Sequence, residues 1–172
     1  MTENMKEQLE QSVGDTFFEW LNIQRRTNYC FSRRAGEAPD LVYADGDKEL
    51  FVEVTTAYAH KDHAEFLWKN ASGARNAPEV WDGIEPDRSL AQEVVNLIAN
   101  KSKKRYGNNC ILLVNIPPGV TPEGELLVLL TGAPLPAPVD LPFVGVYVVG
   151  RFPVRDPFYT GGYGVIPIKE LQ

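Results

Sequence analysis

Residues Pro39–Thr55 read PDLVYADGDKELFVEVT, and the other elements of the chain are interpreted around this stretch. It predicts a β-hairpin in which a strand over 40–44 enters a tight turn over 45–48 and returns as a strand over 49–55. The Asp-Gly pair supplies the positive φ that a two-residue hairpin turn requires. Antiparallel pairing then brings Asp40, at the start of the first strand, beside Glu53, near the end of the second.

Glu53 is the unusual residue of this hairpin. The strand around it is rich in β-branched residues and mostly apolar on both faces, which is typical of a central strand covered by helices on each side. A buried carboxylate needs a metal, a cation or a proton to offset its desolvation. Two carboxylates that converge at the open end of a hairpin therefore predict a divalent-metal site. The alternative is that Glu53 lies on an edge face and is simply solvated.

The remaining chain surrounds the hairpin with alternating helices and strands. A long amphipathic helix is predicted over 4–24, and a first strand over 27–34. A short helix follows Thr56, then a long polar loop over 71–87 and an amphipathic helix from Asp87 or Ser89 to Arg105. Later elements are expected as strands over 109–116, 143–149 and 164–168 and a helix over 121–130. This order predicts one α/β domain spanning 1–172, a mixed sheet with helices on both faces.

Composition narrows the function classes. The 172 residues are 44% hydrophobic, and their formal net charge of -6 disfavours broad coating of nucleic acid, which needs many Lys and Arg. No apolar run approaches the ~20 residues of a membrane span, so we expect no membrane partner. Cys30 and Cys110 lack a CxxC spacing and are expected to be reduced strand residues in a cytoplasmic protein.

Three features together resemble the restriction-endonuclease-like, or PD-(D/E)xK, nuclease superfamily. They are Glu19 within the first helix, the Pro39-Asp40 pair that opens a strand, and the sequence Glu53-Val54-Thr55 in the next strand. The resemblance covers the chain from the first helix to about residue 116. It implies a restriction-endonuclease-like core that hydrolyses phosphodiester bonds with Mg²⁺ or Mn²⁺. It also implies nucleic acid as the partner and a homodimer as the assembly.

The resemblance assigns roles to individual residues. Asp40, Glu53 and the backbone carbonyl of Val54 would be the metal ligands, and Mg²⁺ accepts such a small set because it keeps several waters. Thr55 stands where the family has a lysine that helps to position or activate the attacking water. A threonine can orient a water but supplies no positive charge.

Two consequences of this substitution stay open. A lysine from elsewhere can replace the missing charge, and Lys101 and Lys104 on the following helix are the candidates, although cations at a helix C-terminus are common for other reasons. Alternatively, the domain is a catalytically inactive descendant that serves as a nucleic-acid or protein interaction module. A third reading is an unrelated α/β fold whose hairpin acids are structural.

Two further residues invite a metal interpretation. His60 and His63 have a spacing that zinc accepts, but no third ligand is evident, so a solvated helix start is favoured.

Overall fold

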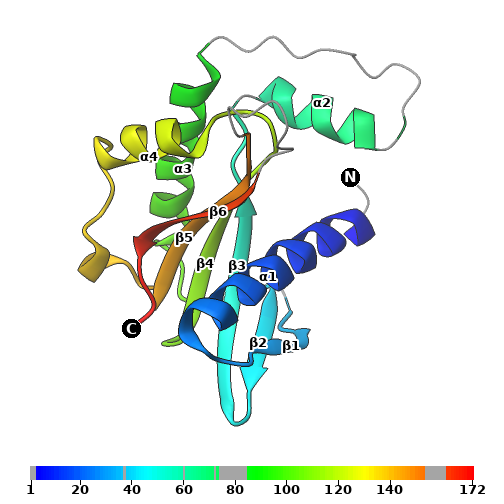
Figure 1. The fold of residues 1–172 in the computed structure, drawn as a ribbon, viewed down its shortest axis with the longest axis vertical. Coiled ribbons are helices and arrows are strands. Elements are labelled where there is room, and N and C mark those ends of the chain that lie inside the picture. The colour runs from blue at the N-terminus through cyan, green and yellow to red at the C-terminus, as the bar shows by residue number, and fades with distance from the viewer. Residues whose placement is uncertain (1–2, 37, 60, 72, 74–84, 154–161) are drawn as a thin grey trace.

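The computed structural model describes residues 3–36, 38–59, 61–71, 73, 85–153 and 162–172. These residues form an open six-stranded sheet in which the spatial order of the strands equals their order in the sequence. The strands are β1 (Cys30–Arg34), β2 (Leu41–Asp45), β3 (Lys48–Thr56), β4 (Cys110–Ile116), β5 (Gly145–Phe152) and β6 (Gly162–Lys169). The pairs β3–β4 and β4–β5 are parallel, and the outer pairs are antiparallel (Figure 1). The predicted mixed α/β sheet is confirmed.

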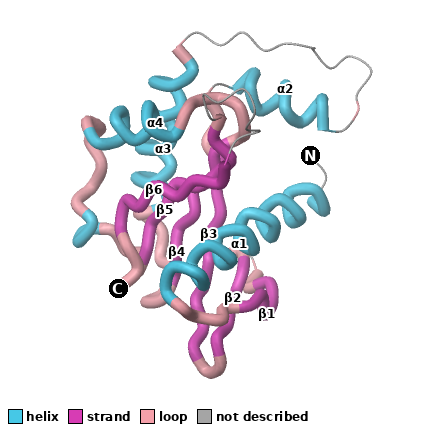
Figure 2. Tube along the Cα trace, in the orientation of Figure 1, coloured by secondary structure: helices cyan, strands magenta, loops and turns pink. Residues whose placement is uncertain are grey.

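Helices cover both faces of this sheet (Figure 2). They are α1 (Glu3–Arg25), α2 (Lys61–Ala71), α3 (Pro86–Lys101) and α4 (Glu123–Thr131), with a short 3-10 turn at Pro138–Asp140. On one face α1 packs through Val13, Phe17, Phe18 and Leu21. On the other face α3 packs through Leu90, Val94 and Ile98, and α4 packs beside it through Leu126 and Leu130. No helix among the described residues is both long and apolar enough to cross a membrane.

The hairpin forms at the predicted place. Its two turn residues are Gly46 and Asp47, and of these only Gly46 has a positive φ, of 59°. In β3 the residues Val52 and Val54 pack on the α1 face, so the intervening Glu53 points to the α3 face. The strand is therefore buried on both sides, as its composition predicts, and the sheet continues through β4.

Several predicted boundaries differ from the structure by two residues or more, and two of these differences have a local cause. The first strand begins at Cys30 and not at residue 27, because the side chain of Asn22 bonds both the N–H and the carbonyl of Tyr29 and holds them outside the strand ladder. The helix predicted to reach Arg105 ends at Lys101, where the buried stripe has ended at Ile98 and a turn follows. Most of the predicted 71–87 loop lies outside the described residues, as do the side chains of His60 and His63.

Candidate functional site

Asp40 lies at the point where β2 starts and β3 runs on past it. The Asp40 N–H donates to the carbonyl of Val52 at 3.0 Å, and Asp40 Oδ2 accepts the N–H of Val54 at 2.8 Å. The Asp40 carboxylate thus accepts the Val54 N–H where the regular backbone pairing of β2 with β3 has ended. Within a strand the N–H and C=O of one residue point to the same side, so the carbonyl of Val54 faces this same edge.

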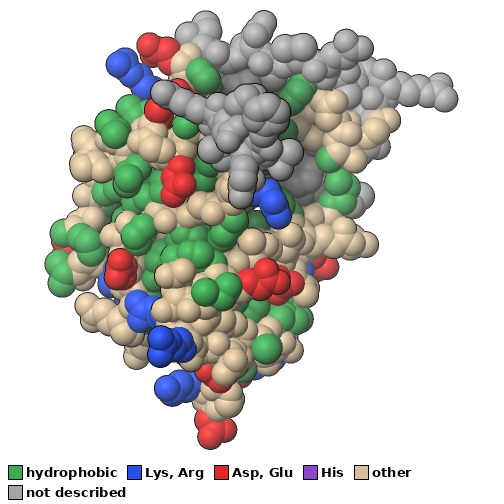
Figure 3. Space-filling view, viewed as in Figure 1, with side chains coloured by type: hydrophobic (Ala, Val, Ile, Leu, Met, Phe, Trp, Pro, Cys, Tyr) green, Lys and Arg blue, Asp and Glu red, His purple; other side chains and the backbone are tan. Residues whose placement is uncertain are grey.

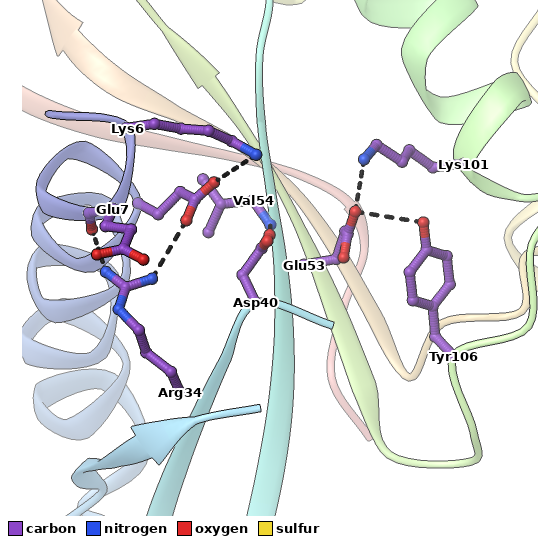
Figure 4. A network of polar contacts seen from close by, with 9 residues as sticks. Lys6, Glu7, Arg34, Asp40, Glu53, Val54, Lys101 and Tyr106 are labelled. Carbon is purple, nitrogen blue, oxygen red and sulfur yellow. Dashed lines mark hydrogen bonds and ion pairs between the residues drawn. The ribbon is translucent and has the colours of Figure 1, made fainter. Parts of the chain in front are cut away.

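The register of the hairpin places Asp40 opposite Glu53. Leu41 pairs with Val52 at the end of the ladder, and Asp40, one residue further, bonds Val52 and Val54 on either side of Glu53. Leu41 and Val52 both pack towards α1, so alternation along β3 turns Glu53 to the α3 face, whereas the Asp40 carboxylate stays at the edge of β3, on the Val54 N–H. Figure 4 shows the Asp40 carboxylate beside the backbone of Val54 and the Glu53 side chain directed towards Lys101 and Tyr106.

The environment of Asp40 favours its protonated form more than water does. The pKa of Asp40 is raised to about 6, mainly by burial and in part by the charges of Glu53 and Glu10, against the opposing effects of the Val54 N–H bond and of Lys101. A cation bound at this position would therefore relieve the cost of ionising Asp40. Because this pKa is about 6, a charged ligand that binds beside Asp40 can change the ionised fraction of its carboxyl group.

Glu53 is buried, with only 4% of its surface exposed. Its Oε1 accepts a hydrogen bond from Lys101 Nζ at 2.5 Å and another from the Tyr106 hydroxyl at 3.3 Å. Its Oε2 is buried and has no hydrogen-bond partner among the described residues. An unsatisfied buried oxygen of a carboxylate is costly, so this atom is the place where an additional ligand would contribute most.

The opposite side of β3 carries a second charged cluster, built on α1. The carboxylate of Glu10 is buried and has two cationic neighbours: Lys6 Nζ at 3.3 Å and Arg34 Nη1 at 3.3 Å. Arg34 also donates to the backbone carbonyl of Glu7, which ties the end of β1 to α1. The charge of Glu10 raises the pKa of Lys6, and the charges of Asp40 and Glu53 add to that effect. The two clusters therefore interact electrostatically across the end of β3.

A cavity of about 220 Å³ opens between the two clusters. Thr55 is part of its wall, whereas Asp40 and Glu53 are not among the lining residues. The wall as a whole combines two lysines, one acid, the end of β3 and two larger side chains: Lys6, Leu9, Glu10, Val54, Thr55, Thr56, Tyr58 and Lys101.

The structure brings some of the predicted residues together and leaves others apart. Lys101 reaches Glu53, whereas Lys104 is exposed on the turn after α3. Glu19 is exposed on α1, nine residues along the helix from Glu10. The α1 glutamate that adjoins the hairpin acids is thus Glu10.

Sequence reasoning missed Glu10, Lys6 and Tyr106, and it named Arg34 only as part of a basic surface pair with Arg33. One signal was available for Glu10, because it extends the buried stripe of Val13 and Phe17 towards the N-terminus at steps of three and four. A charged residue in line with an apolar stripe is as informative as Glu53 within its strand. Lys6 then follows as the residue one turn before Glu10. Arg34 and Tyr106 offered no comparable pattern.

The donor set was tested for its fit to a divalent cation. The described residues contain no group of three or more His, Cys, Asp or Glu side chains that could hold a metal. Two carboxylates and the Val54 carbonyl are hard oxygen donors, sufficient for Mg²⁺ or Mn²⁺ and unsuited to zinc. The unsatisfied Oε2 of Glu53 and the desolvated carboxyl of Asp40 fit such an ion. Lys101 competes with it at Oε1.

Comparisons with known proteins add little to this geometry. No protein-family model matches the chain, and no curated protein matches it. Among solved structures it has a weak neighbour, SfsA of Pyrococcus furiosus in complex with Ca²⁺, at a TM-score of 0.28 and 14% sequence identity. The match covers 95% of this chain and spans 61% of the length of SfsA. A likeness of this size identifies no family, so the functional argument depends on the residues of the chain.

Proposed function

We propose that the chain is a divalent-metal-dependent, nuclease-like domain that hydrolyses phosphodiester bonds. The observation that carries this proposal is the presence of two acids at the open end of one hairpin: Asp40, which bonds the Val54 N–H, and Glu53, whose Oε2 is buried and without a hydrogen-bond partner among the described residues. The resemblance of the Pro39-Asp40 and Glu53-Val54-Thr55 segments to the PD-(D/E)xK superfamily supports the same reaction.

In this proposal Asp40, Glu53 and the Val54 carbonyl hold Mg²⁺ or Mn²⁺. When bound, the ion neutralises charge on the scissile phosphate and acidifies a water. Thr55, in the wall of the cavity, orients that water through its hydroxyl. Lys101 balances the charge of Glu53 in a buried position.

The proposed substrate is a nucleic acid held at one local site. The face shown in Figure 3 has lysine and arginine side chains scattered among acidic ones, with no continuous basic surface over its described residues. The net charge of -6 agrees with a small contact area on the phosphate backbone.

Calorimetric titration with Mn²⁺ tests the metal site, and cleavage of labelled DNA and RNA oligonucleotides tests the reaction. We expect Asp40→Asn and Glu53→Gln each to weaken Mn²⁺ binding by roughly 10-fold or more and to abolish cleavage. The matched controls are Asp47→Asn in the hairpin turn and Glu49→Gln near the start of β3, which should behave as the wild type. Absence of Mn²⁺ binding by the wild-type chain would refute the proposal.

A specific observation favours one alternative function. Lys101 already neutralises Glu53 at 2.5 Å, and Thr55 supplies no charge in the cavity, as expected of a site that has lost catalysis. On this alternative the domain is an interaction module for nucleic acid or protein. Oligonucleotide binding that persists in Asp40→Asn, together with no cleavage by the wild type, would favour it.

A further inference from the structure

Two lysines approach the end of β3 from opposite faces of the sheet. Lys6 comes from α1 and Lys101 from α3, and both contribute to the wall of the cavity beside Val54 and Thr55 (Figure 4). An anionic substrate that enters this cavity meets both ammonium groups. Their different surroundings decide which of them is available to bind it.

Lys101 forms a buried ion pair with Glu53. The two side chains are 21% and 5% exposed, and their charged atoms are 2.5 Å apart. If Lys101 turned towards a ligand, the buried carboxylate of Glu53 would retain only the hydroxyl of Tyr106. Removing one partner of a buried ion pair is strongly unfavourable unless another cation replaces it, so without a bound ion Lys101 is held at Glu53.

Lys6 is in the opposite situation. Its side chain is 59% exposed, and its partner Glu10 has a second cation in Arg34. When Lys6 turns away, Arg34 still compensates the charge of Glu10. Glu10 Oε1, which faces Lys6, is buried, but the charge of Glu10 keeps one counter-ion in Arg34, so releasing Lys6 costs less than releasing Lys101 would.

We infer that Lys6 binds a substrate phosphate beside Asp40 and Glu53, and that Arg34 makes this possible by holding Glu10 in its place. The inference rests on the proposed function, since it takes the phosphate of a nucleic-acid strand as the ligand. It assigns to α1 the positive charge that Thr55 does not supply. Lys6 lies on the α1 side of β3 (Figure 4), so the phosphate is approached from there.

The test measures how a 12-nucleotide, phosphorothioate-linked, fluorescein-labelled DNA strand binds in the presence of Mn²⁺ over a range of KCl concentrations. The phosphorothioate linkage slows cleavage during the measurement. Each phosphate contact on a single strand contributes about 0.7 to the slope of log affinity against log salt. Lys6→Gln should weaken binding roughly 5-fold and reduce that slope by about 0.7.

Two variants make the result specific. Lys6→Arg retains the charge and should restore the affinity and the slope. Lys48→Gln removes an exposed lysine from the opposite end of the same strand, and should match the wild type. Wild-type affinity and slope in Lys6→Gln would overturn the inference, as would failure of the wild type to bind the strand.

Calorimetry with Mn²⁺ alone separates this inference from the proposed function. Lys6 is not among the proposed ligands, and its removal takes a positive charge from their neighbourhood. Lys6→Gln should therefore bind Mn²⁺ at least as tightly as the wild type. If Lys6→Gln binds Mn²⁺ and the DNA strand as the wild type does, only the role of Lys6 is rejected. If the wild type does not bind Mn²⁺, the metal site itself is rejected.

Discussion

β3 carries two glutamates four residues apart, each paired with a cation, and their surroundings differ sharply. Glu49 pairs with Arg33 where both side chains are open to solvent, at 38% and 49% exposure. Glu53 pairs with Lys101 where the carboxylate is 5% exposed, and one of its oxygens has no partner among the described residues. Glu49 thus belongs to an ordinary surface ion pair, whereas Glu53 is a buried carboxylate with one oxygen that has no hydrogen-bond partner among the described residues.

The largest difference between the two pairs should appear in stability. Glu53→Gln leaves Lys101 without its counter-ion in a partly buried position, and we expect it to lower the free energy of unfolding by about 1–3 kcal/mol. Glu49→Gln disrupts an exposed pair and should cost about 0–1 kcal/mol. Urea unfolding at pH 7 measures both. Equal losses would show that burial does not distinguish the two ends of β3.

A smaller effect should appear in the pH dependence of stability. Because burial raises the folded-state pKa of Asp40 to about 6, above its unfolded value near 4, the folded chain binds more protons between these values. The free energy of unfolding contributed by Asp40 should therefore fall as pH rises from about 4 to 6, by on the order of 1 kcal/mol for a group that is partly exposed.

Asp40→Asn removes this titration and should flatten that part of the curve, and Asp47→Asn in the exposed turn should not. Mn²⁺ affinity should change in the opposite direction, rising with pH towards 6, because the ion needs the ionised carboxylate. Thermal unfolding and calorimetry between pH 4 and 7.5 check both trends. If the free energy of unfolding of Asp40→Asn and of the wild type depended on pH in the same way, Asp40 would not be the group that titrates between pH 4 and 6.

The smallest effects should come from Glu19 and Lys104, which are exposed and lie apart from the residues that line the cavity. Glu19→Gln and Lys104→Gln should each change the free energy of unfolding by less than about 0.5 kcal/mol. Neither should alter Mn²⁺ binding or cleavage. A loss of cleavage in either variant would show that the site extends beyond the two charged clusters around β3.

Patterns within single elements made most of the fold predictable. The alternation and Asp-Gly turn of the hairpin, the stripe of Val13 and Phe17 on α1, and the apolar strand from Cys110 each specify their own element. Boundaries were missed where a side chain from another element intervenes, as Asn22 does at Tyr29.

The site was readable only in part because its charges come from distant positions. Asp40 and Glu53 belong to one hairpin, and the antiparallel return of the chain brings both to its open end. Whether Lys101 or Lys104 reaches Glu53 depends on the rotation of α3 over the sheet, and the cluster of Glu10 with Arg34 depends on how α1 crosses β1. Neither relation is encoded in a local spacing.

The site residues differ in how far apart they lie in the sequence, and this affects how the site is assembled. Asp40 is 14 residues from Val54, and a local hairpin joins them, whereas Lys101 is 48 residues from Glu53. Short loops close at lower entropic cost, so the acidic half of the site depends on local contacts and its cations on the docking of helices. Substitutions in the segment between β3 and β4, which contains α3, can therefore change the cations near the acids while the hairpin that carries the acids stays intact.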